Sequence, residues 1–248
     1  NWRPPENLPR WDFLLLGGDL CSNESQLQEW LVRYCPAIPT YVVAGNHEYE
    51  DQGMGAYVLR MQEFCRQEVP WVTYLERQSV VGPKGVVIAG ATLWTDFEFN
   101  GTLSSSLERA RRLPDFCRTT RDFKGRRLTP EGARELHLES RRWLGEALSC
   151  EQTKPDVVLT HFAPAGVAVE ARYKQEDNSY WVSDLSHLVE KVPFWGHGHT
   201  HRGYEAKQGG GVLACNARGY SYLSGLAQVV DFDPCKSWEV ELRRPQSD

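Results

Sequence analysis

Residues 192–201 read Val-Pro-Phe-Trp-Gly-His-Gly-His-Thr-His, a short apolar run that ends in three alternating histidines. The apolar half is typical of a buried β-strand, and the glycines allow the backbone to turn tightly where the strand ends. The alternation places the imidazoles of His197, His199 and His201 on one side of an extended segment. Imidazole nitrogens are common ligands of transition metals, so this stretch predicts metal binding at the end of a strand.

Three other segments repeat the pattern of an apolar run followed by a metal-seeking side chain. The candidates are Asp19 after residues 14–18, Asn46 and His47 after residues 41–45, and His161 after residues 157–160. Loops at strand ends are where α/β proteins place functional groups, and carboxylate and amide oxygens are suitable metal ligands. Each candidate taken alone has a plainer interpretation, as a helix cap for Asp19, a turn residue for Asn46 or a hydrogen-bonded His161.

Apolar runs alternate with helical patterns along most of the chain, which predicts an α/β fold with helices outside the sheet. A Thr-Pro pair at 129–130 fits a helix start. Two apolar runs near the C-terminus predict neighbouring strands without a helix between them, so a mixed sheet is expected. Strands are predicted at 13–16, 41–44, 86–91, 157–159, 192–195, 212–214, 226–232 and 238–242, and helices at 26–33, 57–67, 136–148 and 185–191.

Size and composition indicate one globular domain over residues 1–248, because the candidate ligands come from both halves and must meet. The net charge of −5 disfavours a general grip on nucleic acid, and with it a nuclease. No apolar run is long enough to cross a bilayer, so no membrane partner is expected. Seven cysteines without a C-x-x-C pair favour a reduced, cytoplasmic protein.

Several residues outside these motifs are candidates for shaping a substrate site. The arginine-rich segment 97–127 predicts a helical or irregular excursion beside the site, with a solvated surface insertion as the alternative. Arg218, with Asn216 close by, is a candidate for binding a phosphoryl oxygen, against a structural salt bridge. Pocket-lining or packing roles are equally open for Trp94, Asp96 and Tyr180.

The chain resembles the calcineurin-like metallophosphoesterase superfamily, in a bacterial-type branch. The matching motifs, in the expected order, are Gly18-Asp19, Gly45-Asn46-His47-Glu48, Thr160-His161 and Gly198-His199-Thr200-His201, with further likeness at 91–94, 183–185 and 215–220. The resemblance implies two packed mixed sheets flanked by helices, a four-layer sandwich with a two-metal centre at the strand ends. It also implies roles for individual residues: Asp19 bridges two divalent cations, Asn46, His161 and His199 hold the second, His201 holds the first, His47 is catalytic, and His197 is a neighbour.

One family motif is missing, because no Asp-x-His occurs anywhere in the chain, and with it two ligands of the first metal. The abrupt start at Asn1 favours an upstream strand outside this sequence over a divergent member with a depleted first site. The ligand types suit manganese, iron or zinc.

The expected function is hydrolysis of a small phosphate ester, a diester or a monoester, by a metal-activated hydroxide. The alternative is a catalytically weak scaffold that binds metal and phosphate. Oligomeric state is left open.

Overall fold

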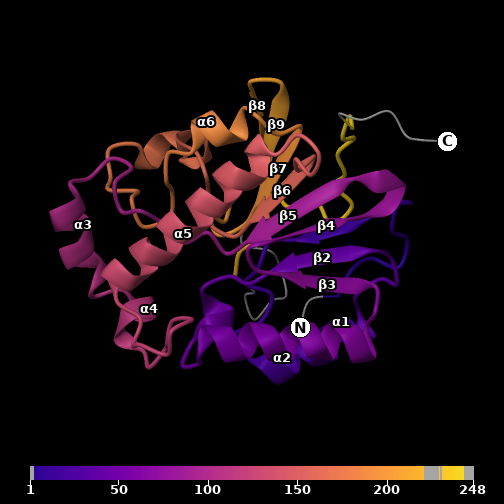
Figure 1. The fold of residues 1–248 in the computed structure, drawn as a ribbon, viewed down its shortest axis with the longest axis horizontal. Helices are drawn as coiled ribbons and strands as arrows, with labels where there is room; N and C mark the ends of the chain where they lie inside the picture. The colour runs from indigo at the N-terminus through magenta and orange to yellow at the C-terminus, as the bar shows by residue number, and fades with distance from the viewer. Residues whose placement is uncertain (1–2, 221–228, 230, 243–248) are drawn as a thin grey trace.

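The computed structural model describes residues 3–220, 229 and 231–242, which form two β-sheets with helices on their outer faces (Figure 1). The smaller sheet has the strand order β1-β2-β3, and its neighbouring strands run parallel. Its strands are β1 (Leu14–Leu16), β2 (Thr40–Val43) and β3 (Val72–Leu75). This sheet is therefore parallel, and the mixed pairing expected from the sequence belongs to the larger sheet.

The larger sheet has the strand order β4-β5-β6-β7-β9-β8. Its four central strands are parallel, while β4 and β8 pair antiparallel at the two edges. The strands are β4 (Gln78–Val81), β5 (Val87–Ala91), β6 (Val157–Thr160), β7 (Phe194–His197), β8 (Gly203–Gln208) and β9 (Gly211–Asn216).

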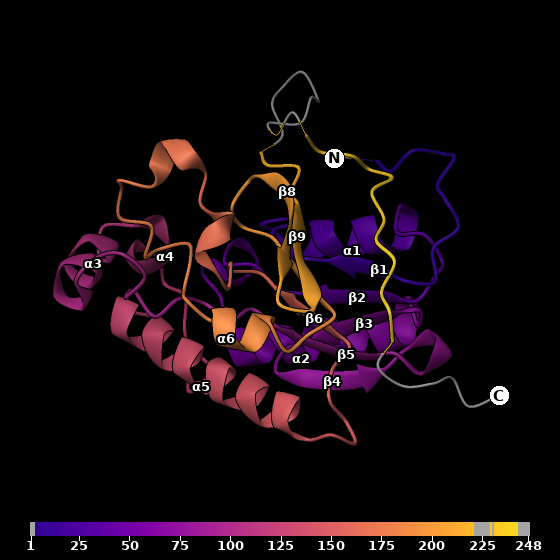
Figure 2. The same cartoon turned by 90° about the horizontal axis from the view of Figure 1, so that it is seen from above.

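Alternate side chains along the strands face opposite layers, as the pleat of a strand requires. In β2, Tyr41 and Val43 lie in the core between the sheets, whereas Val42 packs into the core that the helices cover. In β7, Phe194 faces the other sheet and Trp195 faces the helices. The layers are helices α1 (Glu24–Arg33) and α2 (Met54–Glu68), the small sheet, the large sheet, and helices α5 (Pro130–Ser149) and α6 (Ser186–Val189) (Figures 1 and 2). This is the four-layer arrangement that the resemblance implied.

Two of the helices begin at residues whose side chains cap them, α1 at Asn23 and α5 at Thr129. Asn23 accepts a hydrogen bond from the Ser25 backbone N–H at 3.0 Å, and Thr129 accepts one from Gly132 at 3.1 Å. Each satisfies an N–H group that has no partner inside its helix. The helices are α1 (Glu24–Arg33), α2 (Met54–Glu68), α3 (Leu103–Ala110), α4 (Pro114–Cys117), α5 (Pro130–Ser149) and α6 (Ser186–Val189).

The six apolar runs that predicted strands before residue 215 all form strands, with ends shifted by up to two residues, whereas β3, β4 and β8 were not predicted. The strand predicted at 226–232 lies largely outside the described residues. The strand predicted at 238–242 is wrong, because this segment has no strand structure. Its apolar side chains Trp238, Val240 and Leu242 are partly buried against the core between the sheets. The alternating pattern therefore indicates one face of an extended segment that packs on the core without pairing with a strand.

The helices and the cysteines both bear on the environment expected for the protein. Among the described helices, none is both long and apolar enough to span a bilayer. All seven cysteines lie within the described residues, and each is a free thiol.

Candidate metal centre

The four loops that carry the predicted ligands meet beyond the carboxyl ends of strands in both sheets. Asp19 follows β1, Asn46 follows β2, His161 directly follows β6, and His199 follows β7. The carboxyl ends of parallel strands lie at one edge of a sheet, so packing the two sheets face to face brings these loops together. The residues come from both halves of the chain, with Asn46 and His161 separated by 115 positions.

His161 is the centre of the cluster. Its Nε2 lies 3.2 Å from Asp19 Oδ2, 3.1 Å from Asn46 Oδ1 and 3.0 Å from His199 Nδ1. One ligand atom each from Asp19, His161 and His199 can be chosen so that all lie within 4.8 Å of one another. The structure therefore brings together four of the five predicted metal ligands.

The donor chemistry of this cluster fits a cation. His161 Nδ1 lies 2.6 Å from the carbonyl oxygen of Gly17, which only accepts hydrogen bonds, so Nδ1 carries the proton. In neutral His161 the Nε2 lone pair then faces acceptor atoms of Asp19 and Asn46 and the His199 ring nitrogen, which a cation at their centre would satisfy together. The buried Nε2 of His199 has no hydrogen-bond partner in the described part of the chain.

Burial and neighbouring charges shift the pKa values of the three titratable side chains in the metal-free cluster. Burial disfavours the charge on Asp19, but the adjacent His161 outweighs it and lowers the pKa of Asp19. Burial likewise opposes protonation of His161, while Asp19 outweighs it and raises the pKa of His161. Burial and the neighbouring His161 hold the pKa of His199 well below its ordinary value, so this imidazole stays neutral and keeps a lone pair.

The backbone is strained where it presents the ligands. Asp19, His199 and His201 have φ values of 55°, 62° and 43°, in the left-handed region that side-chain-bearing residues rarely adopt. Gly18, at φ 85°, makes the turn before Asp19, and a Cβ there would lie 2.8 Å from a backbone carbon of the β2 loop. Residue 18 therefore has to be glycine for the two ligand loops to approach each other.

Glu48 links the loop after β1 to the loop after β2 by hydrogen bonds, a role that its place in the sequence motif did not reveal. Its buried carboxylate accepts backbone N–H bonds from Asp19 at 2.8 Å, Leu20 at 2.6 Å and Gly45 at 2.8 Å. Burial first, and then the charge of Asp19, raise the pKa of Glu48 to about 7, while the N–H donors favour the ionised form. Glu48 thus positions Asp19 without pointing at the cluster.

His47 lies beside the cluster in a short 3₁₀ turn, His47–Tyr49. Its backbone N–H donates to Asp19 Oδ1 at 3.1 Å, and its ring Nδ1 lies 2.7 Å from Glu50 Oε1. Arg118 Nη2 in turn lies 3.1 Å from Glu50 Oε2. Burial lowers the pKa of His47, but Asp19 and Glu50 outweigh it, so the net shift is upward and favours the protonated imidazole.

The remaining predicted site residues lie around this cluster. The His201 ring is outside the three-residue group and packs edge-on against Tyr220, with ring centroids 4.6 Å apart. Both ends of the Asn216 amide bind the backbone of Asp233, at 2.7 and 3.1 Å. The Arg218 carbonyl accepts a bond from residue 229 at 3.2 Å. Substrate contacts by Asn216 and Arg218 stay predictions.

His197 has other partners for both ring nitrogens, namely the Gly198 carbonyl at 2.8 Å and the Tyr204 hydroxyl at 2.6 Å. This agrees with its expected place beside the ligands. Its burial lowers the pKa of the imidazole to about 4.

Asp115 is a functional candidate that sequence reasoning missed. It belongs to α4, in the 97–127 excursion, and its Oδ1 accepts a bond from Asn46 Nδ2 at 2.7 Å. This bond fixes the amide so that its oxygen points toward His161. No local pattern marks Asp115, because its importance depends on where the excursion folds back.

A narrow cavity adjoins the cluster at the same place. It is lined by Asp115 and His199 together with several aromatic residues, including Trp94 and Tyr180, two of the residues proposed from the sequence. Asp96, the third, does not line it; its carboxylate lies 3.8 Å from His137 Nε2.

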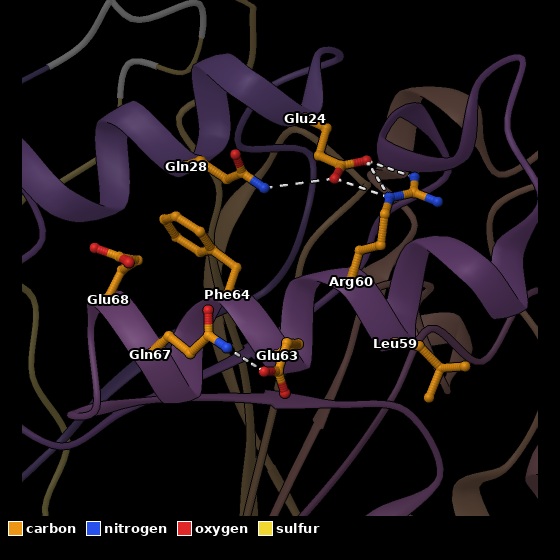
Figure 3. Close-up of a pocket in the computed structure, with 8 residues that line it drawn as sticks. All are labelled: Glu24, Gln28, Leu59, Arg60, Glu63, Phe64, Gln67 and Glu68. Carbon is orange, nitrogen blue, oxygen red and sulfur yellow. Dashed lines mark hydrogen bonds and ion pairs between the residues drawn. The ribbon is translucent and has the colours of Figure 1, made fainter.

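A separate hollow lies between α1 and α2 (Figure 3). Arg60 in its lining pairs with Glu24 at 2.6 Å, and none of the predicted site residues lines it. This hollow is therefore not part of the predicted metal and substrate site.

Replacing Asp115 with asparagine is expected to weaken divalent-cation binding by roughly 10- to 100-fold, because residues that orient metal ligands typically contribute this much. The Asn46 amide would lose a charged acceptor and turn more freely. Calorimetric titration with Mn²⁺ or Zn²⁺ measures the change. Glu108→Gln, an exposed acid in α3, is the matched control, and equal affinities in the two variants would contradict the role of Asp115.

The metal-free protein is expected to lose stability as the pH falls from about 6.5 toward 4, in part through His197. In this window the unfolded state binds a proton that native His197 does not, so acid favours unfolding by up to about 3 kcal/mol from this residue. Urea unfolding of the wild type and of His197→Gln across this range measures the difference. The free energy of unfolding should depend less on pH in His197→Gln than in the wild type, and the exposed control His187→Gln should behave like the wild type. The same pH dependence in all three proteins would contradict this role of His197.

Comparison with known proteins finds a matching family model and solved structures of similar fold. A family model described as calcineurin-like phosphoesterase matches residues 3–203. The solved phosphopantetheinyl hydrolase of Mycobacterium tuberculosis is similar with a TM-score of 0.62 at 17% identity, covering 94% of this chain and 91% of that one. A Thermus thermophilus protein, TT1561, has a TM-score of 0.48 at 15% identity, covering 83% and 76%. No curated protein sequence matches the chain.

Proposed function

Since the chain belongs to the calcineurin-like phosphoesterase family, we propose that it hydrolyses a small phosphate ester, either a phosphodiester or a phosphomonoester. The observation that carries this proposal is the convergence of Asp19, Asn46 and His199 on His161 Nε2, at 3.0 to 3.2 Å. Four such donor atoms from four separate loops form a site for a hard or borderline divalent cation.

The cofactors proposed are two divalent cations, of manganese, iron, zinc or a similar metal. Asp19, Asn46, His161 and His199 would hold one, and Asp19 with His201 would contribute to the other. Bound cations supply Lewis acidity, which offsets phosphoryl charge and makes water a nucleophile at neutral pH.

His47 is proposed as the catalytic acid that donates a proton to the leaving oxygen. Its raised pKa favours the protonated imidazole, and Glu50, at 2.7 Å, fixes the ring through Nδ1 so that Nε2 is the donor. Arg218 and Asn216 are proposed to contact the nonbridging phosphoryl oxygens. The Asp19 carboxylate in turn positions His47 by accepting a hydrogen bond from the His47 backbone N–H.

The expected setting follows from the composition. We propose a cytoplasmic location, because seven free thiols without a disulfide are typical of a reducing compartment. The proposed partner is the phosphate ester itself, without nucleic acid, because a net charge of −5 gives no general grip on a phosphate backbone.

The proposal is tested with bis(4-nitrophenyl) phosphate and 4-nitrophenyl phosphate, with Mn²⁺, Fe²⁺ or Zn²⁺ added singly, while bound metal is counted by elemental analysis. Turnover with about two equivalents of metal supports the hydrolase. One equivalent or none, with phosphate ester bound and not cleaved, would favour the scaffold alternative that the missing Asp-x-His motivates.

Replacing His47 with asparagine is expected to lower kcat by roughly 10²-fold, the usual contribution of a general acid. Metal content should stay unchanged, because the cluster uses the backbone and not the ring of His47. The exposed His187→Asn is the matched control. Equal kcat in the two variants would remove His47 from the mechanism.

A further inference from the structure

Trp181 exposes an aromatic ring beside the metal centre. The side chain is 39% exposed, and its ring centroid lies 5.5 Å from that of His199. On the other side His199 packs against Phe162 at 4.2 Å. The Trp181 carbonyl accepts the Ala163 N–H at 3.3 Å, two residues after His161. The backbone that carries this ring is thus bonded to the segment that supplies a metal ligand.

Tyr220 exposes a second ring at the same centre. It is 57% exposed, and its ring lies 4.6 Å from the His201 ring and 6.5 Å from the His47 ring. Exposing a large aromatic side chain to water is unfavourable, because its apolar surface is then hydrated. In the described part of the chain, only Tyr173 is a further exposed aromatic residue. Two of these three rings contact histidines of one site, which is the pattern of a binding surface.

An aromatic surface and a cationic centre recognise different halves of a phosphate ester. The face of an aromatic ring carries partial negative charge, so it does not bind a phosphoryl group. The same face stacks well on another flat ring, and Trp and Tyr offer it with little loss of side-chain freedom. The aromatic lining continues from Trp181 into the narrow cavity, through Trp94 and Phe162.

We propose that Trp181 and Tyr220 form the leaving-group subsite, which takes a planar aromatic or heteroaromatic ring attached close to the ester oxygen. This inference rests on the proposed phosphoester hydrolysis and adds the class of substrate. The phosphoryl group occupies the cluster of Asp19 and the histidines, and the leaving group lies along the exposed rings.

The test compares benzyl phosphate with cyclohexylmethyl phosphate, and also their methyl diesters. Both leaving groups are primary alcohols with the same number of carbons, so the comparison isolates the flat ring from the chemistry of the bond that breaks. The expected kcat/KM favours the benzyl ester by about tenfold. Trp181→Leu and Tyr220→Leu should each lower this ratio toward one; because the ratio is taken within one variant, a loss that is common to both esters cancels. Tyr173→Leu, whose ring packs on Arg172, is the control that keeps the ratio.

A binding measurement separates this inference from the function on which it rests. Benzylphosphonate and cyclohexylmethylphosphonate, which are not cleaved, are titrated calorimetrically into the metal-loaded protein. A benzyl preference that Trp181→Leu abolishes supports the subsite even if the protein turns over neither ester. The lack of turnover would then count against the proposed hydrolysis and not against the subsite. Equal affinities and equal kcat/KM, unchanged in the leucine variants, overturn the subsite and leave phosphoester hydrolysis standing.

Discussion

Asp19→Asn should reduce kcat by roughly 10³-fold, because it removes the one carboxylate of the ligand cluster. The substitution keeps the size of the side chain and deletes its charge. In the wild type, Oδ2 lies 3.2 Å from His161 Nε2 and Oδ1 accepts the His47 N–H at 3.1 Å. One carboxylate therefore both faces the cluster and positions the proposed acid.

Elemental analysis and Mn²⁺ titration should show the same loss in the binding of metal by Asp19→Asn. Asp12→Asn is the matched control, since Asp12 lies just before β1 and pairs with Lys84 at 2.8 Å on the surface. Metal content and kcat equal to the control values would mean that the cluster is not the metal centre.

Glu48→Ala should lower the free energy of unfolding by about 3–5 kcal/mol, the typical cost of breaking a buried, hydrogen-bonded charge network. The backbone N–H groups of Asp19, Leu20 and Gly45 would lose their acceptor inside the protein. Glu48→Gln keeps one acceptor oxygen but turns an NH₂ group toward the remaining donors, so a smaller loss is expected.

Urea unfolding measures both Glu48 variants, with the exposed Glu146→Ala in α5 as the control, where a change within about 0.5 kcal/mol is expected. Because Glu48 holds the Asp19 loop, metal affinity should fall in Glu48→Gln even where the protein remains folded. A Glu48→Gln protein with wild-type stability and metal affinity would show that the two loops are held in place by other contacts.

The apolar runs were sufficient to locate most of the sheet, because burial on both faces gives a central parallel strand a continuous hydrophobic signature. β2 and β6 are buried along their whole length and were predicted within one residue. The edge strands β4 and β8 were missed, since all their residues are exposed or only partly buried and several carry polar side chains. Edge strands lie against the sheet on one side only, which leaves the sequence pattern weak.

The site divides in a similar way. Spacing and residue type identified Asp19, Asn46, His161 and His199, because a ligand that follows a strand leaves a local mark. Asp115 left no such mark, since a carboxylate in one short helix of a polar segment looks like any surface acid in the sequence.

The sequence by itself determined which side chains can bind a cation and that each stands at the end of a strand, because both properties depend on neighbouring residues. Tertiary structure alone decided that Asp19, Asn46 and His199 converge on His161, that Glu48 joins two loops, and that Asp115 holds Asn46. It also decided that two aromatic rings stay exposed beside the histidines. These contacts join residues far apart in the sequence, such as Asn46 and His161, which are 115 positions apart. Strand order and the course of the loops fix such contacts, and no local periodicity encodes them.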